Sequence, residues 1–322
     1  MGNRIVPRDP FLFDFKNLLK YNTLKKRRSI MSEFQKEILT LLLKGFTTKN
    51  LEEIFLIPKQ KLVKEYYHIL NNRRHLLTSE EYAIIYQAYL DNYSFKDFSN
   101  EKIIFIADTH IGSKNENLEY LRQVKDFIKQ NKFKYLIHAG DLGDGMVNYH
   151  RKVSTYPKQI EHILANYDLG EDIYQYILGG NHDKKYQKRS KDILQLLREQ
   201  KPNIENIGYY QAYFTINALP ISLEHGSHQN QIFVNPSFRI LGHAHYLKFK
   251  ESSLILPPLC DGFPNKEIYG EPGFVTLESS KDDKDVILDF TSYGITENGP
   301  EQSLNRIYTL KPKMSKKVDL SK

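Results

Sequence analysis

Five short clusters of aspartate, asparagine and histidine stand out along the chain. In chain order they are Asp108 and His110; Asp141 and Asp144; Asn181, His182 and Asp183; His225; and His243 and His245. Imidazole nitrogens, carboxylates and an amide oxygen together suit divalent ions such as manganese, iron, zinc or nickel. Seven ligands drawn from this set are too many for one four-coordinate zinc ion, so they predict two ions that share a carboxylate. Two metal ions about 3.5–4 Å apart form a clamp that is used to hydrolyse phosphate esters.

Two of the clusters contain residues that are two positions apart, Asp108 with His110 and His243 with His245. Positions i and i+2 of an extended backbone point to the same side. We therefore expect each pair to reach one pocket from an extended segment.

The clusters follow short apolar runs that would position them. Runs at 102–107, 135–139 and 173–178 alternate with helical stretches at 117–130 and 157–167, and further short runs come later. This alternation predicts an α/β domain with buried strands. Ligands of such domains bind beyond the carboxyl ends of the strands, so the five clusters are expected to meet there. His138 lies inside an apolar run and is expected to be a core residue.

The order D-x-H, G-D-x-x-D, G-N-H-D, H and G-H-x-H resembles the motif set of the calcineurin-like metallophosphoesterases. That resemblance implies a double β-sandwich flanked by helices, over residues 101–300. It implies that Asp108, His110 and His245 hold a first metal, that Asn181, His225 and His243 hold a second, and that Asp141 bridges both. Mn²⁺ is the expected ion, with Fe, Zn, Ni or Mg as alternatives, and a bridging hydroxide would attack phosphorus. His182 would donate a proton or stabilise charge at the leaving oxygen, Asp144 would orient His182, and Asp183 would support the turn.

Departures from the family pattern restrict the class of phosphate ester that we expect as the substrate. Protein phosphatases of the family read G-D-x-x-D-R-G and R-G-N-H-E, and their arginines clamp a dianionic monoester. This chain has glycine in place of both arginines, Gly145 in the first motif, and Asp183 in place of the glutamate. The pattern favours phosphodiesters. Two segments combine basic residues with tyrosine, a combination that suits a channel for a nucleic-acid backbone. They are the loop 148–159, which includes Arg151, and residues 184–191, which contain five Lys/Arg.

The first 95 residues are expected to form a separate helical domain. Helices are predicted at 33–44, 47–55 and 59–72, and their order and spacing resemble the helix-turn-helix of LuxR-type regulators. Lys59, Lys61 and Lys64 should lie on the exposed side of the third helix and contact DNA, with Leu62, Tyr66 and Ile69 on its buried side. A fourth helix is predicted at 78–90, a linker at 91–100, and a partly disordered basic tail at 301–322.

Charge and composition are consistent with a polyanionic partner. The chain of 322 residues has a net charge of +7, and its first hundred residues hold 17 Lys/Arg against 11 Asp/Glu. A basic end suits nucleic acid, with DNA favoured. The single cysteine, Cys260, is typical of a reducing compartment, and neither a signal peptide nor an apolar run long enough for a membrane helix is found, so we expect a cytoplasmic protein without a membrane partner.

Three functions follow from these observations. The first is a metal-dependent nuclease or phosphodiesterase whose N-terminal helices grip nucleic acid. The second is a phosphatase or pyrophosphatase of small nucleotides, with those helices as a partner or homodimer module. The third is a nucleic-acid-binding protein with a vestigial metal site, and the intact motifs count against it.

Overall fold

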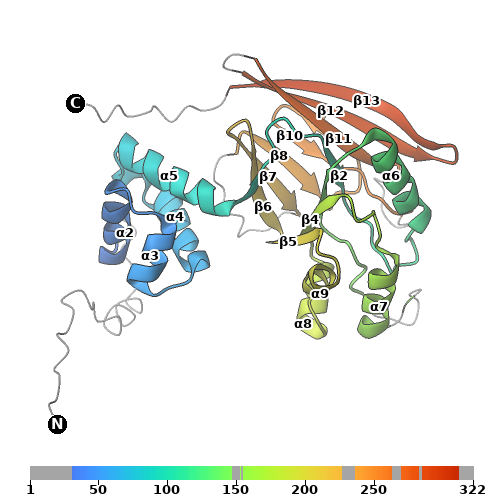
Figure 1. Ribbon diagram of the computed structural model, residues 1–322, viewed down its shortest axis with the longest axis horizontal. Coiled ribbons are helices and arrows are strands. Elements are labelled where there is room, and N and C mark those ends of the chain that lie inside the picture. The colour runs from blue at the N-terminus through green and yellow to red at the C-terminus, as the bar shows by residue number, and fades with distance from the viewer. Residues whose placement is uncertain are drawn as a thin grey trace, which may run out of the picture.

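The computed structural model describes residues 31–146, 153, 155–226, 236–262, 270–282 and 285–311. A helical module at the N-terminal side is followed by a larger domain with two β-sheets (Figure 1).

The helical module forms because each helix has a sequence-encoded end. Its elements are α2 (Glu33–Leu43), α3 (Thr48–Phe55), α4 (Lys59–Asn72), a 3₁₀ turn η1 (Arg74–Leu76) and α5 (Ser79–Tyr93). Gly45 takes a left-handed φ of 85° after α2, Thr47 caps α3, and Thr78 and Glu81 form the expected capping box before α5. Apolar side chains from all four α-helices share one core. The four helices expected in this part of the chain are confirmed.

Two sheets make up the larger domain. The six-stranded sheet has the order β1-β6-β7-β8-β10-β9 and the seven-stranded sheet has the order β13-β12-β11-β2-β3-β4-β5. The strands of the first sheet are β1 (Ser94–Asp97), β6 (Gln211–Ile216), β7 (Leu219–His225), β8 (Phe238–Gly242), β9 (Lys248–Lys250) and β10 (Ser253–Ile255). Those of the second are β2 (Ile103–Ile106), β3 (Tyr135–Ala139), β4 (Tyr174–Gly179), β5 (Ile204–Tyr209), β11 (Gly273–Asp282), β12 (Asp285–Thr296) and β13 (Gly299–Leu310). Strands β2 to β5 run parallel.

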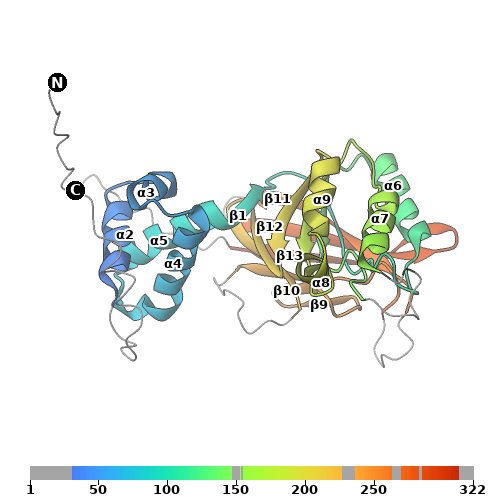
Figure 2. The same ribbon diagram turned by 90° about the horizontal axis from the view of Figure 1, so that it is seen from below.

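The seven-stranded sheet has an apolar layer on each face. Ile103 and Phe105 of β2 enter the core between the two sheets, whereas Ile104 and Ile106 enter a second core under the helices. This alternation explains why β2 is apolar at every position. The helices are α6 (Leu118–Asn131), α7 (Tyr156–Asn166), α8 (Asp183–Arg189) and α9 (Ile193–Gln200), and they line one outer side of the domain (Figure 2).

The expected linker at 91–100 is corrected by the structure. Helix α5 continues to Tyr93, and β1 then pairs in parallel with β6 at the edge of the six-stranded sheet. Phe98 is fully buried in the core between the sheets, against Phe95, Tyr176 and Phe214. The residues around Phe95 and Phe98 are polar, so the sequence does not indicate a strand here. The rings of Phe95 and Phe98 nevertheless attach the helical module to the sheet.

The C-terminal boundary also differs from the expectation. Residues 301–310 belong to β13, which pairs with β12 along its length. Most of its side chains are exposed and only Tyr308 is buried. This strand is stabilised by its hydrogen-bonded ladder rather than by an apolar pattern, so the sequence gives little sign of it. Residues 312–322 lie outside the described part.

Within the described residues, no helix is long and apolar enough to cross a membrane.

Candidate metal centre

The polar clusters meet where the sheet topology places them. Three follow the parallel strands β2, β3 and β4, His225 ends β7, and His243 and His245 follow β8. Backbone hydrogen bonds join neighbouring loops: Asp108 N donates to Gly140 O and His110 N donates to Asp141 O. The loops after β2 and β3 are therefore held in fixed register.

The backbone of these loops is not extended. The expectation that extended segments carry the pairs Asp108 with His110 and His243 with His245 is therefore wrong. Asp108, His110, Asp141, His243 and His245 have φ values of 54°, 44°, 55°, 77° and 59°. Left-handed backbone costs free energy in residues other than glycine and is concentrated at functional sites. The residue types are as expected, but turns rather than a straight strand bring the side chains together.

Asp108, His110 and His245 form a buried first group. Their ligand atoms all lie within 4.8 Å of one another. Asp108 Oδ1 is 3.1 Å from His245 Nε2, and the two histidine Nε2 atoms are 3.3 Å apart. Asp108 Oδ2 also accepts a hydrogen bond from His243 N at 2.8 Å, which links this group to the second one.

The second group consists of Asp141, His225 and His243, again with ligand atoms within 4.8 Å of one another. His225 donates from Nδ1 to the carbonyl of Ala139 at 2.7 Å, so Nε2 is the atom that faces Asp141 Oδ2, 3.0 Å away. A carbonyl partner of this kind orients a metal-binding histidine. His243 is exposed and the other two residues are buried.

Asp141 lies between the two groups. Its Oδ2 is 3.0 Å from His225 Nε2 and 3.9 Å from His110 Nε2. A Cβ at Gly180 would stand 2.1 Å from Asp141 Oδ1 and 2.6 Å from His225 Nε2. Only glycine therefore fits at position 180, and the tight G-N-H-D turn lets its backbone approach this carboxylate.

Asn181 supplies the clearest test of whether a metal fits. Its side-chain Oδ1 is buried and has no hydrogen-bond partner among the described residues. A buried amide oxygen without a partner is costly, and a cation would satisfy it. Together with the carboxylates and imidazoles of the two groups, this oxygen gives a donor set that fits two divalent ions.

The charges of the site influence one another. Burial opposes ionisation of Asp141, but His225 and His110 outweigh it, and the pKa of Asp141 is well below its usual range. Burial lowers the pKa of His225, but the Asp141 carboxylate raises it to about 9 overall. Burial lowers the pKa of His110 to about 3. These shifts favour the anionic form of Asp141 and the neutral form of His110, which are the forms that a metal ligand needs.

His182 lies beside the first group with one ring nitrogen already occupied. Its Nδ1 donates to the main-chain carbonyl of Asp144. The Asp144 carboxylate lies within 4.8 Å of ring nitrogens of His110 and His182. Asp144 was expected to orient His182 through its side chain. The structure adds a hydrogen bond to the Asp144 main-chain carbonyl, which residue types alone do not indicate.

Asp183 holds the turn, as expected. Its carboxylate accepts hydrogen bonds from the backbone N–H groups of Leu142, Gly143 and Gly180, at 3.1, 2.9 and 2.9 Å. The loops after β3 and β4 are thereby joined through one buried side chain. His138 is also buried as expected, with Nε2 3.1 Å from Thr109 Oγ1.

Two supporting residues, Tyr186 and Glu116, were not found from the sequence. Tyr186 Oη accepts from Gly145 N at 2.9 Å and donates to Gln159 Oε1 at 2.7 Å, which fixes the turn after Asp144. Glu116 Oε2 lies 2.8 Å from His162 Nε2 and accepts from Gly112 N, close to His110. These residues sit in or near helices without any motif, so no sequence signal marks them.

The residues proposed to contact DNA lie away from this centre. Lys59, Lys61 and Lys64 are exposed on α4. Leu62, Tyr66 and Ile69 on the other side of the helix are fully buried, as expected. Arg151 lies outside the described residues.

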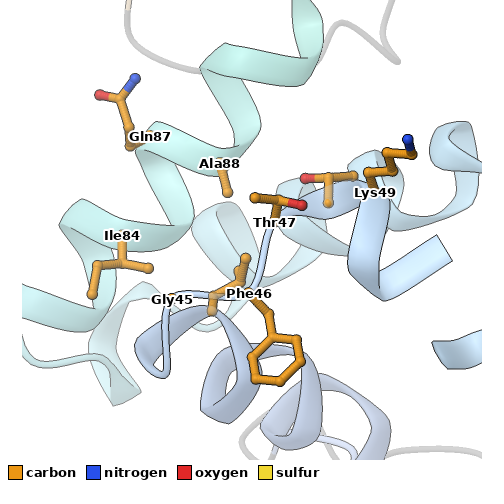
Figure 3. A pocket seen from close by; sticks show the side chains of 9 residues that line it. Gly45, Phe46, Thr47, Lys49, Ile84, Gln87 and Ala88 are labelled. Atoms are coloured by element: carbon orange, nitrogen blue, oxygen red, sulfur yellow. The ribbon is translucent and has the colours of Figure 1, made fainter. Parts of the chain in front are cut away.

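The helical module also contains a cavity of about 470 Å³ between the α2–α3 turn and α5 (Figure 3). Apolar side chains such as Leu42, Phe46 and Ile84 line it, with Lys49 at its edge. It shares no residue with the metal centre.

Comparisons with known proteins give one family match and several similar solved structures. The family profile of calcineurin-like phosphoesterases matches residues 101–310. Similar solved structures include a single mutant of Vps29 from Entamoeba histolytica, with 13% identity and a TM-score of 0.39 over 64% of this chain and 99% of that one. Vps29 from Chaetomium thermophilum has 13% identity and a TM-score of 0.38 over 66% and 97%. The calcineurin-like phosphoesterase YfkN from Bacillus subtilis has 10% identity and a TM-score of 0.32 over 66% and 90%. No curated protein matches the chain.

Proposed function

Because this chain belongs to the calcineurin-like phosphoesterase family, we propose that it is a metal-dependent phosphodiesterase that acts on nucleic acid. The observation that carries this proposal is the position of Asp141 Oδ2, 3.0 Å from His225 Nε2 and 3.9 Å from His110 Nε2. One carboxylate between two groups of ligands is what a dinuclear centre requires.

The proposed ligands follow these groups. Asp108, His110 and His245 would hold one ion, and Asn181, His225 and His243 would hold the other, with Asp141 shared. We propose Mn²⁺, with Fe, Zn, Ni or Mg as alternatives. When bound, two such ions supply positive charge to phosphoryl oxygens and lower the pKa of water.

His182 would act at the leaving oxygen. The carbonyl of Asp144 holds the proton on Nδ1, which orients Nε2 toward a substrate. The Asp144 carboxylate, which lies within 4.8 Å of a nitrogen of this ring, would help to orient it. A protonated Nε2 can donate to the oxygen that departs from phosphorus.

The geometry at Gly145 supports diesters over monoesters. Gly145 has a φ of 58°, and a Cβ there would stand 2.1 Å from the carbonyl oxygen of His182. The arginine that clamps a dianion in the related protein phosphatases therefore has no room at this position. A diester carries one charge less and needs no such clamp.

Nucleic acid is the proposed substrate because of the helical module. Helices α3 and α4 are joined by only three residues, 56–58, as in a helix-turn-helix. Lys59, Lys61 and Lys64 are exposed on α4 and would contact phosphates. We also propose a cytoplasmic location, because the single cysteine, Cys260, is buried within the core rather than placed for a disulfide.

One observation favours the alternative of a small-nucleotide phosphatase or pyrophosphatase. The cavity beside Phe46 would suit a partner protein or a second copy, which would make the helices a docking module. Assays of metal-loaded protein on single- and double-stranded DNA, RNA, a cyclic dinucleotide and a nucleoside triphosphate separate the two functions. Turnover of a nucleotide but of no polymer would favour the alternative.

A further inference from the structure

Helix α8 connects the metal centre to a basic surface. It begins one residue after His182, and its buried side holds Asp183 and Tyr186. Asp183 is hydrogen bonded to both loops of the centre, and Tyr186 is hydrogen bonded to Gly145. The outer side of α8 therefore has a fixed position relative to the site.

That outer side is strongly positive. Residues 184–191, which include the two residues that follow α8, hold five basic residues and no acidic one: Lys184, Lys185, Lys188, Arg189 and Lys191. Lys188, Arg189 and Lys191 are exposed, and within the described part of the chain none of these three has a carboxylate at ion-pair distance.

The nearest acid in the sequence is engaged elsewhere. Asp192 accepts from the backbone of Leu194 and Gln195 as the cap of α9, and also from Tyr209 Oη at 2.7 Å and Gln187 Nε2 at 2.8 Å. Among the described residues, no carboxylate therefore neutralises Lys188, Arg189 or Lys191 at ion-pair distance.

Aromatic and apolar neighbours keep the first two lysines beside the site. Lys184 Nζ lies 4.3 Å from the centre of the Tyr209 ring, and Lys185 Nζ lies 2.8 Å from Met146 Sδ. Tyr156 packs edge-on against Tyr186, with ring centroids 5.6 Å apart.

We propose that the basic residues of α8 hold backbone phosphates of a polynucleotide next to the scissile bond. The seven residues of α8 extend about 10 Å from the centre, which is more than one phosphodiester spans. This inference rests on the proposed phosphodiesterase function, and it adds that the substrate is a polymer that contacts α8 on one side of the cleavage point.

The test is a charge reversal with a matched control. The variant Lys188→Glu, Arg189→Glu, Lys191→Glu changes only the three exposed residues. The control variant Lys129→Glu, Lys132→Glu, Lys134→Glu changes three exposed lysines that precede β3, at the strand end opposite the centre. Both full-length proteins change in charge equally, and circular dichroism checks that both are folded.

Binding of a labelled single-stranded 20-mer is measured by anisotropy in the presence of a chelator, between 50 and 200 mM salt. Each lost phosphate contact should flatten the salt dependence by about 0.7 units of slope, so three contacts correspond to about 2 units and at least tenfold weaker binding at low salt. The control should bind like the wild type. Equal affinity and slope in the α8 variant, or an equal loss in the control, would overturn the inference.

Turnover separates this inference from the proposed function. With metal, the α8 variant should lose at least tenfold in kcat/KM on the 20-mer, mostly through KM, and keep its rate on bis(p-nitrophenyl) phosphate. If the wild type hydrolyses the small diester but no oligonucleotide, the inference fails while diesterase chemistry stands. If the wild type hydrolyses neither, the proposed function fails, and normal 20-mer binding by the α8 variant would then refute the inference separately.

Discussion

At the scale of single residues, Asp141 is the position on which the centre depends most. It is the carboxylate that lies between both ligand groups. Replacing Asp141 by Asn removes the negative charge and should remove hydrolysis and most bound metal. Metal content by mass spectrometry, together with turnover, checks this expectation. A variant that retains two ions per chain and wild-type turnover would refute the bridging role.

His182→Ala should behave differently, because the residue is expected to be no ligand. It should keep its metal but lose on the order of 10²–10⁴ in kcat, the usual range for one positioned acid or base. The loss should be smaller with nitrophenolate, a good leaving group that needs little protonation. Rates for a nitrophenyl and an alkyl diester give the comparison. An equal loss on both would leave charge stabilisation as the role of His182.

At the scale of elements, β1 and the residue that follows it, Phe98, have a structural role that the sequence did not suggest. Phe98 is fully buried and contacts Phe95, Tyr135, Tyr176 and Phe214. Phe98→Ala should therefore destabilise the protein by about 3–5 kcal/mol, as for other buried aromatic residues. Urea unfolding measures the change, with the surface change Phe46→Ala as the control. A loss below 1 kcal/mol would indicate that residues 94–98 act as a linker after all.

Elements with strong local signals could be predicted from the sequence. Helix α4 was expected at 59–72 and spans Lys59–Asn72, because its apolar spacing and the preceding Pro58 both mark it. Strand β3 was expected at 135–139 and spans Tyr135–Ala139, because a buried parallel strand is apolar throughout. Strand β13 was missed because pairing partners, not its own side chains, define it.

The candidate site likewise combines features that the local sequence predicts with features that depend on contacts between distant residues. The residue types in the loops after β2, β3, β4, β7 and β8 indicated which side chains would gather. The left-handed turns at Asp108 and His243 could not be predicted, because they depend on cross-loop bonds such as His243 N to Asp108 Oδ2. The partner of His182 Nδ1 is a main-chain carbonyl, and no residue type encodes it.

At the scale of the whole molecule, the helical module is separate from the metal centre. We therefore expect DNA binding by the module and hydrolysis at the centre to be lost independently of each other. Reversing Lys59, Lys61 and Lys64 to Glu should weaken duplex binding and flatten its salt dependence by roughly 0.9 units of slope per lost phosphate contact. Turnover of a small diester should be unchanged. Anisotropy with a labelled duplex measures the effect.

The three-lysine reversal at 129, 132 and 134 is again the control, because it changes the net charge equally. Unchanged duplex affinity and salt slope in the α4 variant would show that α4 does not grip DNA. The module would then be better explained as a docking or dimer unit, and the cavity beside Phe46 would be the surface to examine next.

The central claim is that the two ligand groups around Asp141 form a metal-dependent phosphodiesterase. The most direct measurement is kcat/KM of Mn²⁺-loaded protein on bis(p-nitrophenyl) phosphate and on p-nitrophenyl phosphate, with Asp141→Asn measured in parallel. We predict a higher value for the diester, no turnover after chelation and none in the variant. Faster turnover of the monoester, or diester turnover that survives both chelation and Asp141→Asn, would contradict the claim.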